Sequence, residues 1–197
     1  MTVDSLQYAG FWPRLGSSLL DFTILLSLGG FVLWGERNHR LFDVYFSLPN
    51  VLFELFYSVY LVKRFGGTPG KLMMGIRIRK LDGGPVGYRE AFIRHLPEFV
   101  NGLALSVAFI IPLLHMSDAE YISLSFLSRI QRLKALAPSW YNPARIAGNI
   151  WVWSELIVLL TNRKRRALHD FIAGTVVVYN QSAPISRPVV TDVVGSS

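Results

Sequence analysis

The sequence predicts an all-α membrane protein, a polytopic bundle of about four transmembrane helices with a small pair of cytoplasmic β-strands. Three observations support this fold class. Hydrophobic residues make up 51% of the 197 residues and charged residues only 17%, and the mean hydropathy of +0.36 is too high for an ordinary soluble domain. The apolar residues gather in four stretches of about membrane-spanning length. Lysine and arginine gather in the connections between those stretches.

The apolar stretches predict spans over residues 11–34, 44–62, 96–114 and 143–161. A spanning helix needs about twenty residues at about 1.5 Å each, and the first three stretches reach or nearly reach that length. The last stretch is apolar only from Ile146, so it spans the bilayer if its helix begins near Asn142 with Arg145 extending to the interface. Trp140 and Tyr141 then lie in the aromatic belt.

The charges between the spans predict the orientation. Residues 63–94 hold eight basic side chains against two acidic ones, whereas residues 35–43 are balanced. Because Lys and Arg are retained on the cytoplasmic side, we expect the basic loop and both termini, including residues 1–10, in the cytoplasm. The sequence therefore predicts a multi-pass membrane protein.

The basic balance of the chain does not indicate nucleic-acid binding. The formal net charge is +7, but the basic residues lie between apolar segments rather than on one face of a domain. The lipid bilayer is the expected partner.

Two segments on the predicted cytoplasmic side have the pattern of strands. Residues 76–79 alternate apolar and charged side chains, and residues 82–85, Asp-Gly-Gly-Pro, are a strong turn signal. Residues 175–179 form a second, β-branched run. We predict that the two runs pair as a small cytoplasmic ribbon.

The connection on the opposite side predicts an amphipathic helix over about residues 118–136. Ser117 and Glu120 form a capping box, and apolar residues recur at helical spacing until Pro138. The helix is expected to lie on the outer interface of the membrane, and a short lid over the bundle is the alternative. Residues 180–197 have little apolar surface to bury and are expected to be mobile.

Three sequence motifs occur in a fixed order along the chain. They are GFWPRL at residues 10–15 followed by Asp21, GTPGKL at residues 67–72 followed by GIRI and Asp-Gly, and RRALHD at residues 165–170 followed by AGTVV. In this order they resemble the RDD family of bacterial membrane proteins, named for one arginine and two aspartates. The resemblance spans residues 9–179, makes residues 11–179 an RDD-like membrane domain, and implies that Arg14, Asp21 and Asp170 are the family residues. It also implies a location in a bacterial inner membrane and a cation/proton antiport, which has been proposed for some members. The outer connection is longer than the simplest members need, so three spans is the alternative to four.

Arg14 and Asp21 form a polar stripe on the first apolar helix. They lie seven positions apart and therefore on one face, with Ser17 and Ser18 between them. A carboxylate in hydrocarbon costs a few kcal/mol and needs a partner, water or a function. The pair either orients helices or responds to protons and cations, and Asp170 could reach Arg14 at the cytoplasmic surface.

Three further acids lie at predicted membrane depth. Glu54 is in the second span, Glu98 begins the third with Asn101 one turn on, and Glu155 is in the fourth. Sodium prefers hard oxygen ligands, so the candidate ion and proton site comprises Asp21, Glu54, Glu155, Glu98 and Asn101. The alternative is an interfacial Glu98 with Glu54 and Glu155 neutral and hydrogen-bonded across helices.

The segment Gly67, Thr68, Pro69, Gly70 and Lys71 does not fit a phosphate-binding loop. Its spacing is one residue short, Leu72 replaces the magnesium-binding hydroxyl and Pro69 lacks a backbone donor. We expect it to turn the chain at the cytoplasmic interface and to offer Lys71 to anionic lipid headgroups.

The sequence gives no sign of a cofactor, a metal site or an enzyme. Cysteine is absent, and the four histidines, His39, His95, His115 and His169, show no helical ligand spacing. No Ser-His-Asp order or enclosed pair of acids suggests catalysis.

The sequence favours a proton-linked transporter such as a cation/proton antiporter, in which Asp21 exchanges a proton for a monovalent cation. Glu54 and Glu155 would add oxygen ligands, while Arg14 and Asp170 would gate the cytoplasmic mouth. Four spans are few for a carrier, so the transporting form is expected to be a homo-oligomer. The alternative is a non-transporting scaffold that assembles with other membrane proteins.

Overall fold

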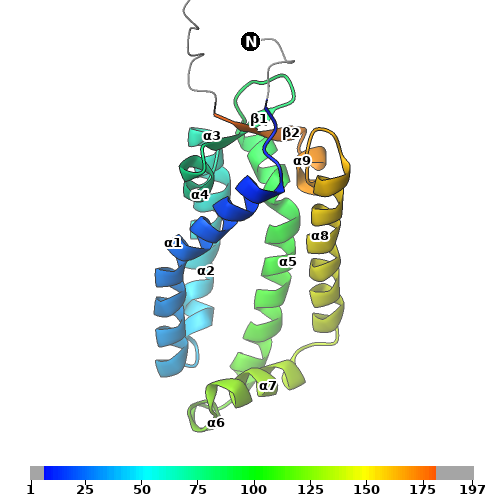
Figure 1. The fold of residues 1–197 in the computed structure, drawn as a ribbon. Helices are drawn as coiled ribbons and strands as arrows, with labels where there is room; N and C mark the ends of the chain where they lie inside the picture. Colours follow the sequence, from blue (N-terminus) through cyan, green and yellow to red (C-terminus); the bar gives the residue numbers. More distant parts are fainter. Residues whose placement is uncertain (1–6, 181–197) are drawn as a thin grey trace, which may run out of the picture.

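The computed structural model describes residues 7–180, which form a bundle of long helices with a two-stranded sheet at one end (Figure 1). Four stretches of helix are long and apolar enough to span a membrane. They are α1 (Phe11–Asn38), the run Phe42–Met73 that contains α2 to α4, α5 (Tyr88–His115) and α8 (Tyr141–Thr161). Large apolar side chains such as Phe22, Leu48 and Trp153 are exposed on these helices, as lipid contact requires. The predicted fold class is confirmed.

The second span changes its helical geometry along its length. It begins as α2 (Phe42–Leu55), widens into a π-helical turn (Phe56–Tyr60) and ends as α3 (Leu61–Phe65). Gly66 closes α3 in the left-handed conformation, with φ of 82°, as glycine does most easily at this position. A short helix, α4 (Pro69–Met73), follows with proline at its first position, where the missing N–H is not needed.

The two strands pair as the sequence predicts. β1 (Ile76–Lys80) is antiparallel to β2 (Thr175–Tyr179), with Ile76 opposite Tyr179 and Lys80 opposite Thr175. Ile76, Ile78 and Val177 are buried against apolar residues of the second span and of α5. We call this end of the bundle, with the sheet, α4 and α9 (Leu168–Ile172), the strand end (Figure 1).

The chain before α1 also joins the sheet. The Ala9 N–H donates a 2.9 Å hydrogen bond to the Val177 carbonyl, and Tyr8 forms a bridge with Val178. β2 therefore has a neighbour on each side.

The helix α5 that contains the predicted third span, residues 96–114, begins eight positions before it, at Tyr88. Gly87 starts the helix, and its N–H donates a 2.8 Å hydrogen bond to the Glu90 carboxylate. This capping contact carries the helix through Arg89 and Arg94, which the hydropathy pattern assigned to the basic loop. The loop is shorter as a result.

The outer connection contains two helices, whereas the sequence predicts one over 118–136. They are α6 (Asp118–Ser123) and α7 (Phe126–Leu136), which lie at the end of the bundle opposite the strands (Figure 1). Ser117 caps α6, and Ser125 starts a new helix because its hydroxyl accepts a 3.3 Å hydrogen bond from the Ser128 N–H. We call this end the α7 end. Residues 1–6 and 181–197, including the tail expected to be mobile, lie outside the described residues.

Candidate functional site

Asp170 lies at the centre of a polar network at the strand end. Its side chain is fully buried on α9. The carboxylate accepts a 2.7 Å hydrogen bond from Arg14 and a second charged contact from Arg94. The Ala167 N–H, at 3.0 Å, and the Thr175 hydroxyl, at 3.3 Å, also donate to it, and His169 Nε2 lies 3.7 Å from Oδ1. The network therefore joins α1, α5, α9 and β2.

These partners decide the charge of Asp170. Burial alone raises the pKa of the carboxyl, but the guanidinium groups of Arg94 and Arg14 lower it more, so the pKa of Asp170 lies well below its ordinary value. Asp170 is consequently ionised at physiological pH. Its role in the strand end is that of a fixed negative charge.

Arg14 pairs with Asp170 and not with Asp21, although both possibilities followed from the sequence. Its Nη2 also donates a 2.7 Å hydrogen bond to the Arg165 carbonyl, and its Nε donates to the Ala9 carbonyl at 3.2 Å. The guanidinium thereby ties the start of α1 to the segment just before it and to the segment that leads into α9.

Asp21 anchors the α4 segment. Its carboxylate accepts hydrogen bonds from the Tyr57 hydroxyl at 2.6 Å, the Thr68 hydroxyl at 2.6 Å and the Gly70 N–H at 2.7 Å. A Cβ on Gly70 would lie 2.7 Å from the Asp21 carboxyl carbon and would also overlap the Ser17 carbonyl. Only glycine lets α4 approach α1 this closely.

The predicted lipid-facing turn is therefore largely a buried contact. Gly67, Thr68 and Gly70 are buried, and Lys71 is half-buried with its ammonium 3.4 Å from the Thr68 hydroxyl. Hydropathy could not indicate this, because the acceptor lies on another helix 49 positions away from Gly70.

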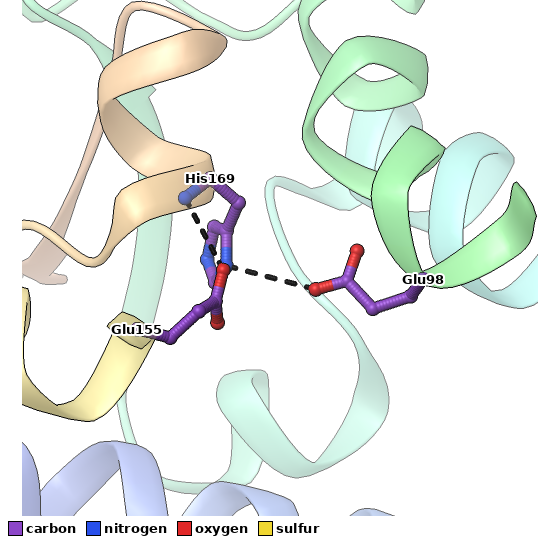
Figure 2. A group of neighbouring side chains, drawn as sticks. All are labelled: Glu98, Glu155 and His169. Atoms are coloured by element: carbon purple, nitrogen blue, oxygen red, sulfur yellow. Dashed lines mark hydrogen bonds and ion pairs between the residues drawn. The ribbon is translucent and has the colours of Figure 1, made fainter. Parts of the chain in front are cut away.

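A second cluster of ionisable groups comprises Glu98, Glu155 and His169. Figure 2 shows the three side chains converging from α5, α8 and α9, and one ligand atom of each lies within 4.8 Å of the others. The His169 Nδ1 contacts the Glu155 carboxylate and lies 3.9 Å from Glu98 Oε1. Trp151 donates a 3.1 Å hydrogen bond to that same oxygen.

Two polar atoms of this cluster have no hydrogen-bond partner among the described residues. They are Glu98 Oε2 and His169 Nε2, and both atoms are buried. Buried polar atoms are normally paired, so these atoms are available to a proton, a water molecule or a cation. Carboxylate oxygens suit hard cations and imidazole also suits divalent transition metals. The sequence argument against a metal site considered spacing within one helix, whereas these ligands come from three.

A small cavity of about 130 Å³ borders the cluster. Its lining includes Glu98, His169, His95, Arg94 and Lys71. On α5, His95 contacts Glu54 of α2, with 3.0 Å between His95 Nε2 and Glu54 Oε1.

The five residues of the predicted ion site therefore occupy different surroundings. Glu98 and Glu155 lie together, Glu54 pairs with His95, and Asp21 binds the α4 segment. Asn101 lies beside Gly148 of α8, where an added Cβ would come within 2.5 Å of its amide.

Sequence reasoning missed Arg94 as a partner of Asp170 and Tyr57 as a partner of Asp21. A usable signal existed for Arg94. Gly87 and Glu90 mark the true start of α5, and a helix from that point puts Arg94 and Glu98 one turn apart on one face. No comparable local signal marks Tyr57, which the π-helical turn carries.

Comparisons with known proteins agree with this architecture. The profile of the RDD family matches residues 8–174, a range that contains Arg14, Asp21 and Asp170. The uncharacterized protein YckC of Bacillus subtilis (strain 168) is 28% identical over 176 residues, which cover 87% of this chain and 84% of that protein. No solved structure matches the chain. With four candidate spans and a family match that runs from the segment before α1 to the end of α9, this membrane protein belongs to the RDD family.

Proposed function

We propose that the chain is a proton-linked transporter of a cation, such as a cation/proton antiporter, and that Glu98, Glu155 and His169 form its exchange site. One observation carries the proposal. Two carboxylates and an imidazole converge within 4.8 Å, and two of their buried polar atoms, Glu98 Oε2 and His169 Nε2, have no hydrogen-bond partner among the described residues, although Nε2 lies 3.7 Å from Asp170 Oδ1. Ionisable groups at membrane depth are costly and commonly serve ion or proton pathways.

The chemistry of the cluster couples cation binding to proton release. A cation binds carboxylate and imidazole only in their deprotonated forms, so its arrival releases a proton and its departure lets one return. The His169–Glu155 contact can hold that proton, because the donor and acceptor already touch. The 40% exposed side chain of Glu98 gives the cation its way in from the cavity.

Asp21 is less suited to this exchange than the sequence suggested. Two of its three hydrogen bonds, those from Thr68 and Gly70, hold the α4 segment, so a cation at Asp21 would have to release that segment. We assign Asp21 an anchoring role and Arg14 and Asp170 a fixed-charge role.

We also propose that the strand end lies on the cytoplasmic side of the membrane. Arg64, Arg77, Arg79 and Arg163 lie in or beside the connections at the strand end, which supports a cytoplasmic location for that end and for both termini in a bacterial inner membrane. The site then faces the cytoplasm. Four spans are few for a carrier, so the transporting form is a homo-oligomer, and the chain has no catalytic role.

The test is dissipation of a preset pH gradient in proteoliposomes on addition of sodium, lithium, potassium or manganese ions. We expect cation-dependent proton movement in the wild type and its loss in Glu98→Gln and Glu155→Gln. Glu120→Gln is the matched control, since Glu120 is an acid on α6 that pairs with Arg132. Loss in Asp21→Asn with the two glutamate variants active would place the site in α1 instead. Absence of flux from folded wild-type protein would favour the scaffold hypothesis.

A further inference from the structure

A second and larger cavity, of about 730 Å³, reaches the α7 end. Residues of α1, α2, α5, α6 and α7 line it, and it extends from Tyr121 and Arg129 at the α7 end to Glu54. Most of its walls are apolar. Three carboxyl groups, those of Glu36, Asp43 and Glu54, share its lining with a single guanidinium, and carboxyl oxygens are suitable ligands for hard cations.

The two cavities meet at one pair of side chains. Glu54 lines the large cavity, His95 lines the small one, and no described residue lines both. The pair joins α2 to α5 through the 3.0 Å contact between His95 Nε2 and Glu54 Oε1. Both side chains are mostly buried, with 14% of His95 and 31% of Glu54 exposed.

We infer that Glu54 and His95 form a closed gate between the large cavity, which reaches the α7 end and offers carboxyl groups to a cation, and the exchange cavity at the strand end. This inference rests on the proposed transport function and adds the path that the cation takes through the bundle. A cation entering the large cavity reaches Glu54, and separation of the pair opens the way to Glu98 and His169.

Both helices have a structural weak point beside the gate. The π-helical turn Phe56–Tyr60 starts two positions after Glu54, and Pro97 lies two positions after His95 inside α5. A π-helical turn departs from the regular helical ladder and a proline removes one of its hydrogen bonds, so helices bend most readily at such places. α2 and α5 can therefore part at the gate without unfolding elsewhere.

Charged groups face the gate from both cavities. Lys71, Arg94, Glu98 and His169 share the small cavity with His95, and Glu36, Asp43 and Arg129 share the large one with Glu54. The basic groups lie mainly on the strand side and the acidic ones on the α7 side. The closed pair thus separates two compartments of opposite electrostatic character.

The absence of cysteine from the chain makes the gate directly testable. Ser47 lines the large cavity and Ser58 the small one, and the two residues stand on either side of Glu54 along one span. We expect Ser47→Cys to react with a membrane-impermeant thiol reagent in vesicles of one orientation, and Ser58→Cys only in vesicles of the opposite orientation. Ser27→Cys is the matched control, because Ser27 is exposed on α1 and lines neither cavity, so lipid should shield it from the reagent.

In a second experiment the gate is opened by removing one of its two side chains. Glu54→Ala, or His95→Ala where that variant folds better, should make both cysteines reactive in both orientations. The exchanged pair Glu54→His with His95→Glu should restore one-sided labelling. Labelling of Ser47→Cys and Ser58→Cys in the same vesicles, or one-sided labelling that survives both alanine variants, would overturn the gate.

The labelling and flux experiments distinguish a failure of the gate from a failure of the proposed transport function. One-sided labelling without cation flux in the wild type would remove the transport function and leave the gate as a barrier between two cavities. Flux combined with same-side labelling would keep the transport function and remove the gate.

Discussion

Arg14 in the first turn of α1 donates a 2.7 Å hydrogen bond to Asp170 of α9, which lies 156 positions later in the chain. Through this contact Arg14 and Asp170 act as one structural unit, whereas Asp21 acts elsewhere. Arg94 completes the unit from α5. The stability of the strand end therefore depends on charges from three distant segments.

Replacing Arg14 tests the strength of this unit. Arg14→Ala leaves the buried Asp170 with one guanidinium, and breaking a buried ion pair typically costs about 3–5 kcal/mol. Arg14→Lys should recover only part of the loss, because a lysine has one nitrogen where arginine uses three separate ones. Thermal unfolding in detergent measures both variants, and equal midpoints for Arg14→Lys and the wild type would contradict the prediction.

Acid should weaken the same unit only at low pH. The folded-state pKa of Asp170 is lowered, so its contribution to stability is present above the unfolded-state value of about 4 and is lost as the pH falls through the folded-state value. We expect the difference in unfolding midpoint between the wild type and Asp170→Asn to be constant from about pH 5 to pH 8 and to shrink below about pH 4. A difference that already shrinks near neutral pH would show that Asp170 is not held ionised.

Asp21→Asn should release the α4 segment without disturbing the Asp170 network. The asparagine keeps one oxygen that can still accept from Tyr57 and Gly70, but its amide group replaces the acceptor beside Thr68 and the negative charge is lost, and a hydrogen bond to a charged group is worth about 1.5–3 kcal/mol. Limited proteolysis within residues 63–75 should become faster, while residues 163–180 keep their protection. Faster cleavage of both regions together would indicate that the two sites are coupled.

Gly70→Ala should have the same effect for a steric reason. The new Cβ would overlap the Asp21 carboxylate and the Ser17 carbonyl, so α4 must move away from α1. Gly29→Ala is the matched control, since a Cβ there meets no atom within 4 Å and alanine favours the helix. Similar proteolysis of the two variants would refute the close approach of α4 to Asp21.

The strand register can be tested by crosslinking. Arg77 lies opposite Val178, so cysteines at these two positions should form a disulfide on mild oxidation. Cysteines at Arg77 and Thr175 are three pairs out of register and serve as the control. Efficient crosslinking of the control pair would show that the ribbon slips.

Sequence patterns predicted the features that depend on local chemistry. Apolar length located the four spans, and alternation at Ile76–Lys80 with the β-branched run at Thr175–Tyr179 located both strands. Their pairing also followed, because both runs were expected on one side of the membrane. These predictions needed only the period and length of a segment.

The partners of the buried acids could not be predicted in this way. Tyr57 and Thr68 reach Asp21 from 36 and 47 positions away, and the Glu98–Glu155–His169 cluster exists only because three helices converge. Hydropathy also did not indicate that α5 begins at Tyr88, because it depends on apolar length and contains no information on the Gly87–Glu90 cap. Long-range packing decides such details.

The position of Asp170 along the chain has a consequence for biosynthesis. Arg14 and Arg94 precede it by 156 and 76 positions, so during translation both guanidiniums are made long before their shared carboxylate. Until α9 and β2 emerge from the ribosome, the inserted helices hold uncompensated positive charge at the strand end. The charges of the strand end are therefore balanced only after Asp170 has been translated. A chain truncated before α9 should keep an unstable strand end and become a substrate for membrane proteases.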